Sequence, residues 1–108
     1  MNRNKLYHKY YTRIKEWNWD AIVEEAKKKP VTNFEGNRYG YFLLGSVFNT
    51  MPSGKYYTYW AHSNVTEEEA ERDEIFIDAL ESIASRYGGW IESGEDDSCD
   101  IFFVISLE

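Results

Sequence analysis

Residues 39–63 read YGYFLLGSVFNTMPSGKYYTYWAHS, and this stretch decides the predicted fold. Two runs within it, 39–48 and 56–61, consist mostly of the aromatic and aliphatic residues that are enriched in β-strands. The residues between them include the sequence MPSG at 51–54, which is typical of a turn. The pattern therefore predicts a β-hairpin.

The first arm of this hairpin is apolar on both of its faces. Successive side chains of a strand point to opposite sides, which places one set of three on one face and another set on the other. The sets are Tyr41, Leu43 and Val47 on one side, and Phe42, Leu44 and Phe48 on the other. We therefore expect both faces of the arm to be covered.

A two-stranded ribbon is only marginally stable in water, so the hairpin needs further strands or a covering helix. The unbroken apolar run 101–105 predicts a strand in the centre of the sheet, and residues 90–92 predict a second closing strand. The polar, acidic residues 93–100 form the predicted turn between these two strands.

The clearest helix is predicted over residues 67–87. Thr66 and Glu69 have the spacing of a capping box, and Gly88-Gly89 ends the helix. The predicted apolar face consists of Phe76, Ala79, Leu80, Ile83, Ala84 and Tyr87. The predicted water-facing side consists of Arg72, Asp73, Glu74, Asp78 and Glu81.

Residues 1–30 are predicted to be helical, because apolar side chains recur at helical spacing from Tyr7 to Trp17. The pattern restarts after Asn18, a residue suited to capping a second helix that ends before Pro30. The spacing leaves open whether this segment is one bent helix or two. Residues 31–38 are predicted to be a polar connector.

Together these elements predict an α+β fold. It contains a mainly antiparallel sheet of about four strands in two hairpins, an amino-terminal helical segment, and one long helix, about 67–87, between the hairpins. A chain of 108 residues is long enough for one core and too short for two. Residues 1–108 are therefore expected to form a single domain, with a helical segment at 1–30 and a hairpin–helix–hairpin core at 39–106.

The formal net charge of −7 is unevenly distributed: the first thirty residues carry +4 and the rest carry −11. A net acidic surface repels nucleic acid at long range and attracts a basic partner. The single cysteine, Cys99, cannot form an internal disulfide, and the chain has neither a targeting signal nor an apolar run of about 20 residues. This predicts a soluble, cytoplasmic protein with no membrane partner.

Acidic side chains provide the candidate partner-binding site. The 93–100 turn crowds four carboxylates into six residues, and the long helix adds two on its outer face. These residues are Glu95, Asp96, Asp97, Asp100, Glu74 and Asp78. The turn lacks the EF-hand ligand pattern, so no metal site and no cofactor is predicted, although weak Ca²⁺ or Mg²⁺ binding and a merely solubilising turn stay open. The leading hypothesis is a non-enzymatic protein-interaction module with an unknown, possibly basic, partner.

Two alternatives stay open. A small enzyme or metal-binding protein would combine the acidic turn with Cys99 and His62, as nucleophile and base. No nucleophile motif surrounds either residue and nearby carboxylates discourage ionisation of the thiol, so no catalytic residue is assigned. A weak nucleic-acid binder would use the basic and aromatic side chains of the first helix: Lys5, Lys9, Arg13, Tyr7 and Tyr10. The same helix is also explained by ordinary amphipathicity, with its rings in the core.

Three segments resemble a known group of proteins. They are PSGKYYT with WA at 52–58 and 60–61, SNVTEEEAE at 63–71, and WIESGEDDSCDIF at 90–102. The segments resemble small uncharacterised proteins encoded by phages and integrated elements of Gram-positive-type bacteria, in which proline more often stands at the position of Ser98. The resemblance covers about residues 39–103 and implies a phage or prophage origin. The group has no activity that can be named, so no catalytic residue carries over.

Overall fold

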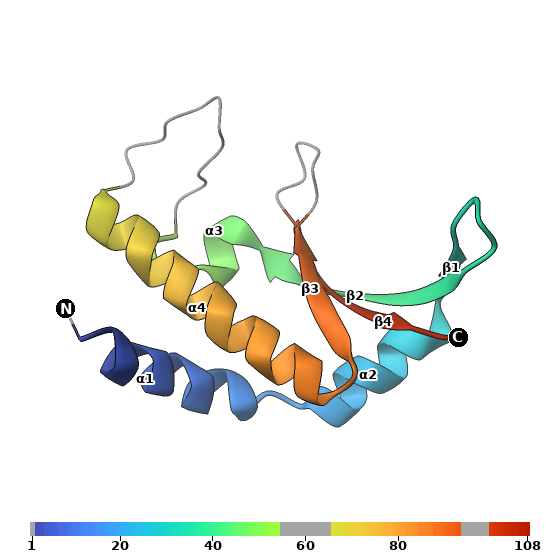
Figure 1. The fold of residues 1–108 in the computed structure, drawn as a ribbon, viewed down its shortest axis with the longest axis horizontal. Helices are drawn as coiled ribbons and strands as arrows, with labels where there is room; N and C mark the ends of the chain where they lie inside the picture. Colours follow the sequence, from blue (N-terminus) through green and yellow to red (C-terminus); the bar gives the residue numbers. More distant parts are fainter. Residues whose placement is uncertain (1, 55–65, 94–99) are drawn as a thin grey trace.

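The computed structural model describes residues 2–54, 66–93 and 100–108 of the chain (Figure 1). Its helices are α1 (Arg3–Lys15), α2 (Trp19–Lys28), α3 (Val47–Thr50) and α4 (Glu67–Arg86). Its strands are β1 (Pro30–Thr32), β2 (Arg38–Ser46), β3 (Gly89–Ser93) and β4 (Asp100–Ser106). The strands form one antiparallel sheet in the order β1-β2-β4-β3. The predicted α+β fold, with a long helix between two hairpins, is confirmed.

The strand β4 lies in the centre of the sheet, as its unbroken apolar run predicts. It pairs with β2 on one side and with β3 on the other. In the register, Phe42 of β2 and Ile91 of β3 both stand opposite Phe103. Because paired residues share a face of the sheet, these three side chains form one row on one side.

The first hairpin differs from the prediction. Part of the predicted polar connector 31–38 is the strand β1, which pairs with the start of β2. All three residues of β1 are exposed, so the sequence contains no alternation of apolar and polar residues that would reveal the strand. The turn is fixed by the side chain of Asn33, which accepts hydrogen bonds from the backbone N–H groups of Glu35 and Asn37. The predicted second arm, 56–61, lies outside the described residues.

The strand β2 also ends earlier than predicted, because residues 47–50 form the short helix α3. The pairing with β4 shifts between Leu43 and Gly45, and Gly45 has a φ of 150°. A Cβ atom at Gly45 would lie 2.6 Å from Oγ1 of Thr50, so glycine allows the chain to bend tightly here. The predicted turn at 51–54 is confirmed, since the N–H of Gly54 donates to the carbonyl of Met51 at 3.0 Å.

The amino-terminal segment forms two helices rather than one. The side chain of Asn18 accepts the backbone N–H of Ala21 at 3.2 Å and caps α2, as its sequence position predicts.

The predicted capping box of α4 is also present. The hydroxyl of Thr66 accepts the N–H of Glu69 at 3.1 Å, and the Glu69 carboxylate accepts the N–H of Thr66 at 3.4 Å.

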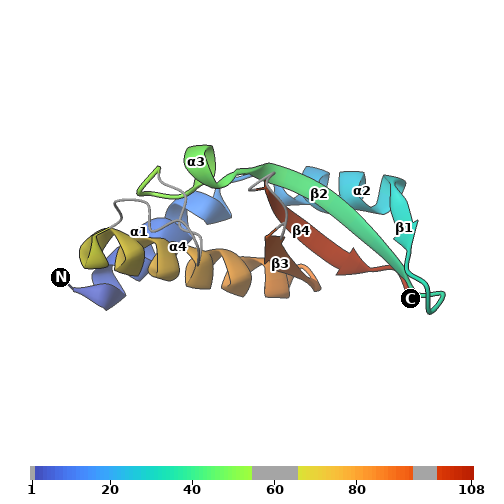
Figure 2. The ribbon, with the colours of Figure 1, turned by 90° about the horizontal axis from the view of Figure 1, so that it is seen from above.

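The helices α1 and α4 lie side by side and run in the same direction (Figure 1). Three hydrogen-bonded pairs join the two helices: Arg3 with Glu71, Tyr7 with Ser82, and Tyr11 with Arg86. The helix α2 lies along β2 (Figure 2). This close approach requires Gly40, where a Cβ atom would lie 2.3 Å from the carbonyl oxygen of Ala26.

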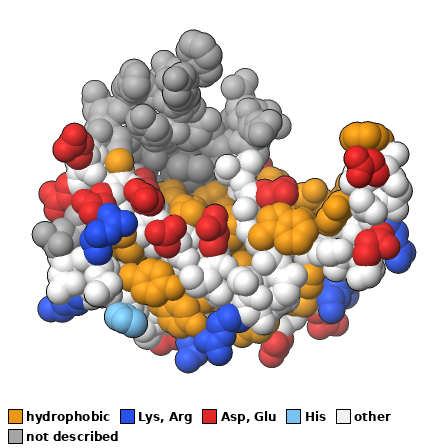
Figure 3. All heavy atoms as spheres, in the orientation of Figure 1, with side chains coloured by type: hydrophobic (Ala, Val, Ile, Leu, Met, Phe, Trp, Pro, Cys, Tyr) orange, Lys and Arg blue, Asp and Glu red, His pale blue; other side chains and the backbone are white. Residues whose placement is uncertain are grey.

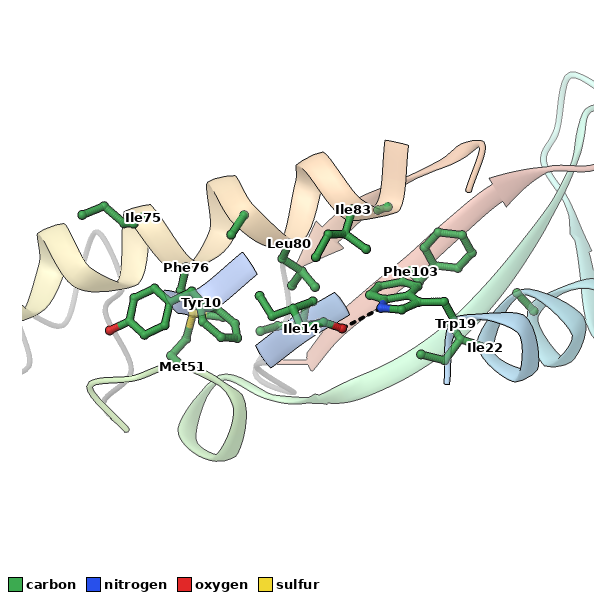
Figure 4. Close-up of a cluster of buried hydrophobic side chains, with 14 of the residues drawn as sticks. Tyr10, Ile14, Trp19, Ile22, Met51, Ile75, Phe76, Leu80, Ile83 and Phe103 are labelled. Carbon is green, nitrogen blue, oxygen red and sulfur yellow. Dashed lines mark hydrogen bonds between the residues drawn. The ribbon is translucent and has the colours of Figure 1, made fainter. Parts of the chain in front are cut away.

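The hydrophobic core lies between these helices and one face of the sheet (Figure 4). Trp19, at the beginning of α2, is one of the large side chains buried in this core. Its indole N–H donates to the backbone carbonyl of Ile14 at 2.8 Å, and its ring packs against Phe103 and Tyr87 with centroids 5.7 and 5.6 Å away. One side chain therefore links α1, α2, the end of α4 and the central strand.

Two predictions about the faces of α4 are wrong. Tyr87 is predicted on the apolar face, and its ring does stack on Trp19 with centroids 5.6 Å apart, but the residue is 39% exposed. Asp73 was expected to face water but is half-buried. Its carboxylate accepts the backbone N–H of Ser53 at 3.0 Å and the Ser53 hydroxyl at 2.7 Å, and so fastens the 51–54 turn to the helix.

Candidate functional site

The two faces of the sheet have different surroundings. Ile101, Phe103 and Ile105 of β4 belong to the core cluster, to which α1, α2 and α4 all contribute. Phe102 and Val104 alternate with these residues and point to the opposite face, and neither belongs to the core cluster. We call this side the open face, and define it by Tyr39, Tyr41, Leu43, Trp90, Glu92, Phe102 and Val104.

Both sides of the first arm are predicted to be covered, but among the described residues helices cover only one side. Phe42 and Leu44 pack against the core cluster, whereas Leu43 between them is 52% exposed. All three helices that form the core lie on the side of Phe42, which leaves the other side without a helix among the described residues. Hydrophobic side chains consequently gather at the surface over the strands (Figure 3).

Aromatic rings on the open face pack against one another. The Tyr39 and Trp90 rings meet edge to face with centroids 5.9 Å apart, and Tyr41 meets Phe102 in the same way at 6.2 Å. In the register, Val104 lies between Tyr41 and Trp90, and it is 0% exposed. Trp90 itself stays 36% exposed. The rings thus combine a fixed geometry with accessible surface.

A carboxylate lies among these rings. The Trp90 indole N–H donates to the carboxylate of Glu92 at 2.9 Å. Burial raises the pKa of the Tyr41 phenol, and the negative charge of Glu92 and the neighbouring Tyr39 add to the rise. Among the described residues, no lysine or arginine forms an ion pair with Glu92. The open face therefore offers aromatic surface and an acidic group without a basic partner in the described chain.

The predicted acidic residues lie in three places. Glu74 and Asp78 are exposed on α4, where acidic side chains gather at the surface (Figure 3). Together with Glu71 they raise the pKa of the neighbouring Arg3 guanidinium, the hydrogen bond to Glu71 being the largest cause. Asp100 is half-buried at the start of β4 opposite Ser46, on the side of the open face. The positions 95–97 lie outside the described residues.

The structure separates the residues of the predicted nucleic-acid surface. Lys5, Lys9 and Arg13 are exposed on α1. Tyr10 is buried against Phe76, with ring centroids 5.4 Å apart. The Tyr7 hydroxyl donates to Ser82 at 2.9 Å. The expectation that Tyr10 stacks on bases is therefore wrong, because its ring holds α1 against α4.

The predicted nucleophile and base, Cys99 and His62, lie outside the described residues. Within the described ranges, no group of three or more His, Cys, Asp or Glu side chains is placed to hold a metal ion. In the same ranges, no helix is both long enough and apolar enough to cross a membrane.

Among the described residues, two concavities are found on the helix side of the molecule. A groove of about 430 Å³ between α2 and β2 is lined by Trp17, Asn18, Ala21, Ile22, Glu25, Phe42 and Leu44. Its polar side chains are already engaged, since Asn18 caps α2 and Glu25 pairs with Lys28. A smaller one of about 210 Å³ is lined by Tyr11, Lys15, Ile83, Arg86 and Tyr87. Neither of these two concavities brings together the acidic and basic side chains that proton-transfer chemistry needs.

The residues of the open face were not predicted as a site from the sequence. Tyr39, Tyr41 and Trp90 were identified only as parts of strands, because apolar residues occupy both sides of β2 and β4. The available signal was the abundance of aromatic residues, with nine tyrosines and four tryptophans in the chain, because Tyr and Trp are enriched at interaction surfaces.

Comparisons of the chain with protein-family models, with curated proteins and with solved structures give no match. The phage or prophage origin implied by the resemblance therefore stays a prediction. A proposal about function therefore rests on the fold and on the geometry of the open face.

Proposed function

We propose that the protein is a non-enzymatic protein-interaction module that binds its partner on the open face. One observation carries the proposal: a sheet face with accessible aromatic and aliphatic side chains has no covering helix among the described residues. Contiguous exposed apolar surface marks interaction sites, and Tyr and Trp are the residues enriched at them. The accessible parts of Leu43 and Trp90 supply the apolar contact.

The charge of the chain favours a basic partner. The net charge is −7, and Glu92 and Asp100 place carboxylates on the side of the open face. Glu74 and Asp78 add exposed negative charge on α4. Charges at the rim of an interface act mainly on the rate of encounter, whereas desolvated apolar and aromatic contacts hold the complex. The open face is therefore the binding surface, and α4 steers the partner towards it.

Affinity capture from a lysate of the source organism, with matched variants as bait, tests the proposal. The open-face variant is Leu43→Ser with Trp90→Ser. The control is Phe34→Ser, which removes a side chain that is 98% exposed in the β1–β2 turn and is not among the residues that define the open face. We expect the wild type and the control to capture the same protein and the open-face variant to lose it.

Circular dichroism and thermal unfolding of all three baits check that each is folded. Retention of the captured protein by the folded open-face variant would contradict the proposal. Loss of the protein in the Phe34→Ser control would also contradict it, because the contact would then lie on the β1–β2 turn.

A further inference from the structure

We infer that the open face recognises its partner through an arginine side chain, bound at a corner formed by Tyr39, Tyr41, Trp90 and Glu92. This inference rests on the proposed function and names the chemistry of the partner. The four residues define the aromatic corner. Its parts lie on β2 and β3, on either side of Val104.

The rings of the aromatic corner are already positioned for a planar cation. Tyr39 and Trp90 lie at an interplanar angle of 82°, so their ring planes point in two nearly perpendicular directions. Tyr39 and Tyr41 are half-buried and Trp90 is partly exposed. Arginine stacks on aromatic faces more often than lysine does, because its guanidinium is flat and weakly hydrated.

The carboxylate of the aromatic corner has its own position fixed. One of its oxygens accepts the Trp90 indole N–H at 2.9 Å, which holds Glu92 beside the ring. A second oxygen can accept a further donor, and a guanidinium carries five. No basic side chain of the described chain forms an ion pair with Glu92. Charge complementarity therefore selects a cationic side chain over a neutral one.

The aromatic corner is also reached without rearrangement of the described elements. The strand β3 is at the edge of the sheet, with β4 as its neighbour among the described strands. Trp90 and Glu92 are adjacent on the same side of this edge strand. A side chain of a docking partner can thus approach the rings and the carboxylate from the border of the sheet.

The test is an NMR titration of the whole, ¹⁵N-labelled protein at low salt with N-acetyl-arginine amide. The neutral isostere N-acetyl-citrulline amide and Nα-acetyl-lysine amide are the comparison probes. We expect the arginine probe to shift the Trp90 indole resonance saturably, and the citrulline probe to leave it unchanged at the same concentration. The Glu92→Gln variant should weaken arginine binding at least about threefold.

The matched control is Glu81→Gln, which removes one exposed carboxylate from α4 and should leave arginine binding unchanged. Equal effects of Glu92→Gln and Glu81→Gln would mean general attraction to an acidic protein and would overturn the inference. A citrulline shift equal to that of arginine, or tighter binding of the lysine probe, would overturn it as well.

The titration is independent of the partner, so its failure is distinct from failure of the proposed function. Loss of capture by the Leu43→Ser, Trp90→Ser variant without any arginine response would support the interaction module and reject the aromatic corner. An arginine response together with unchanged capture would reject the open face as the docking surface.

Discussion

The two faces of the sheet are built from alternate residues of the same strands, but among the described residues helices cover only one of them. On the covered face, Ile101 and Phe103 are buried by α1, α2 and α4. On the open face, Val104 is 0% exposed and stands between Tyr41 and Trp90 in the register, while Leu43 and Trp90 stay accessible.

This difference separates stability from recognition. Side chains on the covered face lose nearly all contact with water and fill the core, so removing one leaves a cavity. Side chains on the open face are only partly buried, so they contribute less to stability and keep apolar surface for a partner. Substitutions on the two faces should therefore have effects of different size and kind.

The largest expected effect comes from Trp19→Ala on the covered side. The change removes a buried ring and its hydrogen bond to Ile14, and should lower the free energy of unfolding by about 3–5 kcal/mol. Trp90→Ala on the open face should cost about 1–2 kcal/mol, because that ring is partly exposed. Urea unfolding of both variants measures the difference, and equal costs would contradict the distinction between the faces.

Gly40→Ala should have the next largest effect. Its added methyl group would meet the Ala26 carbonyl, so α2 must move away from β2, at a cost of about 1–3 kcal/mol. Leu43→Ala, on the same strand but the open face, should cost less than about 1 kcal/mol. Thermal unfolding compares the pair. A Gly40→Ala protein as stable as the wild type would show that the contact between α2 and β2 is not tight.

Neutralising charge on α4 should leave stability almost unchanged. The double variant Glu74→Gln, Asp78→Asn should differ from the wild type by less than about 0.5 kcal/mol, because both side chains are exposed. Association with the captured partner should slow, with a weaker dependence on salt, while dissociation stays the same. Glu92→Gln should instead speed dissociation. Surface plasmon resonance separates the two rates, and a reversed pattern would place the binding surface on α4.

The smallest expected effect is on the alkaline side of the stability profile. The pKa of Tyr41 is raised in the folded protein, so its contribution to stability is complete below pH of about 10 and is lost as pH rises through the folded pKa. Glu92→Gln should lower the pKa of Tyr41, because one cause of the rise is removed. NMR titration of the Tyr41 ring measures both values. An unchanged pKa of Tyr41 in the Glu92→Gln variant would contradict this, because it would mean that the Glu92 carboxylate does not act on the Tyr41 phenol.

Local signals in the sequence determined most of the secondary structure. Asn18 marks the start of α2, and Thr66 with Glu69 marks the start of α4. Each cap forms between residues three apart, so the sequence alone contains the whole interaction. The unbroken apolar run of β4 likewise predicted a central strand, because only a strand with neighbours on both edges buries so many consecutive apolar residues.

The tertiary structure alone decided which face of the sheet is covered. In the sequence, Tyr41 and Leu43 are as apolar as Phe42 and Leu44, so periodicity could not assign either set to the core. The same holds for Tyr10, whose burial depends on α4 lying beside α1. The choice depends on where helices distant in the chain pack, and packing between distant segments leaves no local pattern. The open face, and with it the candidate site, therefore became visible only in the folded molecule.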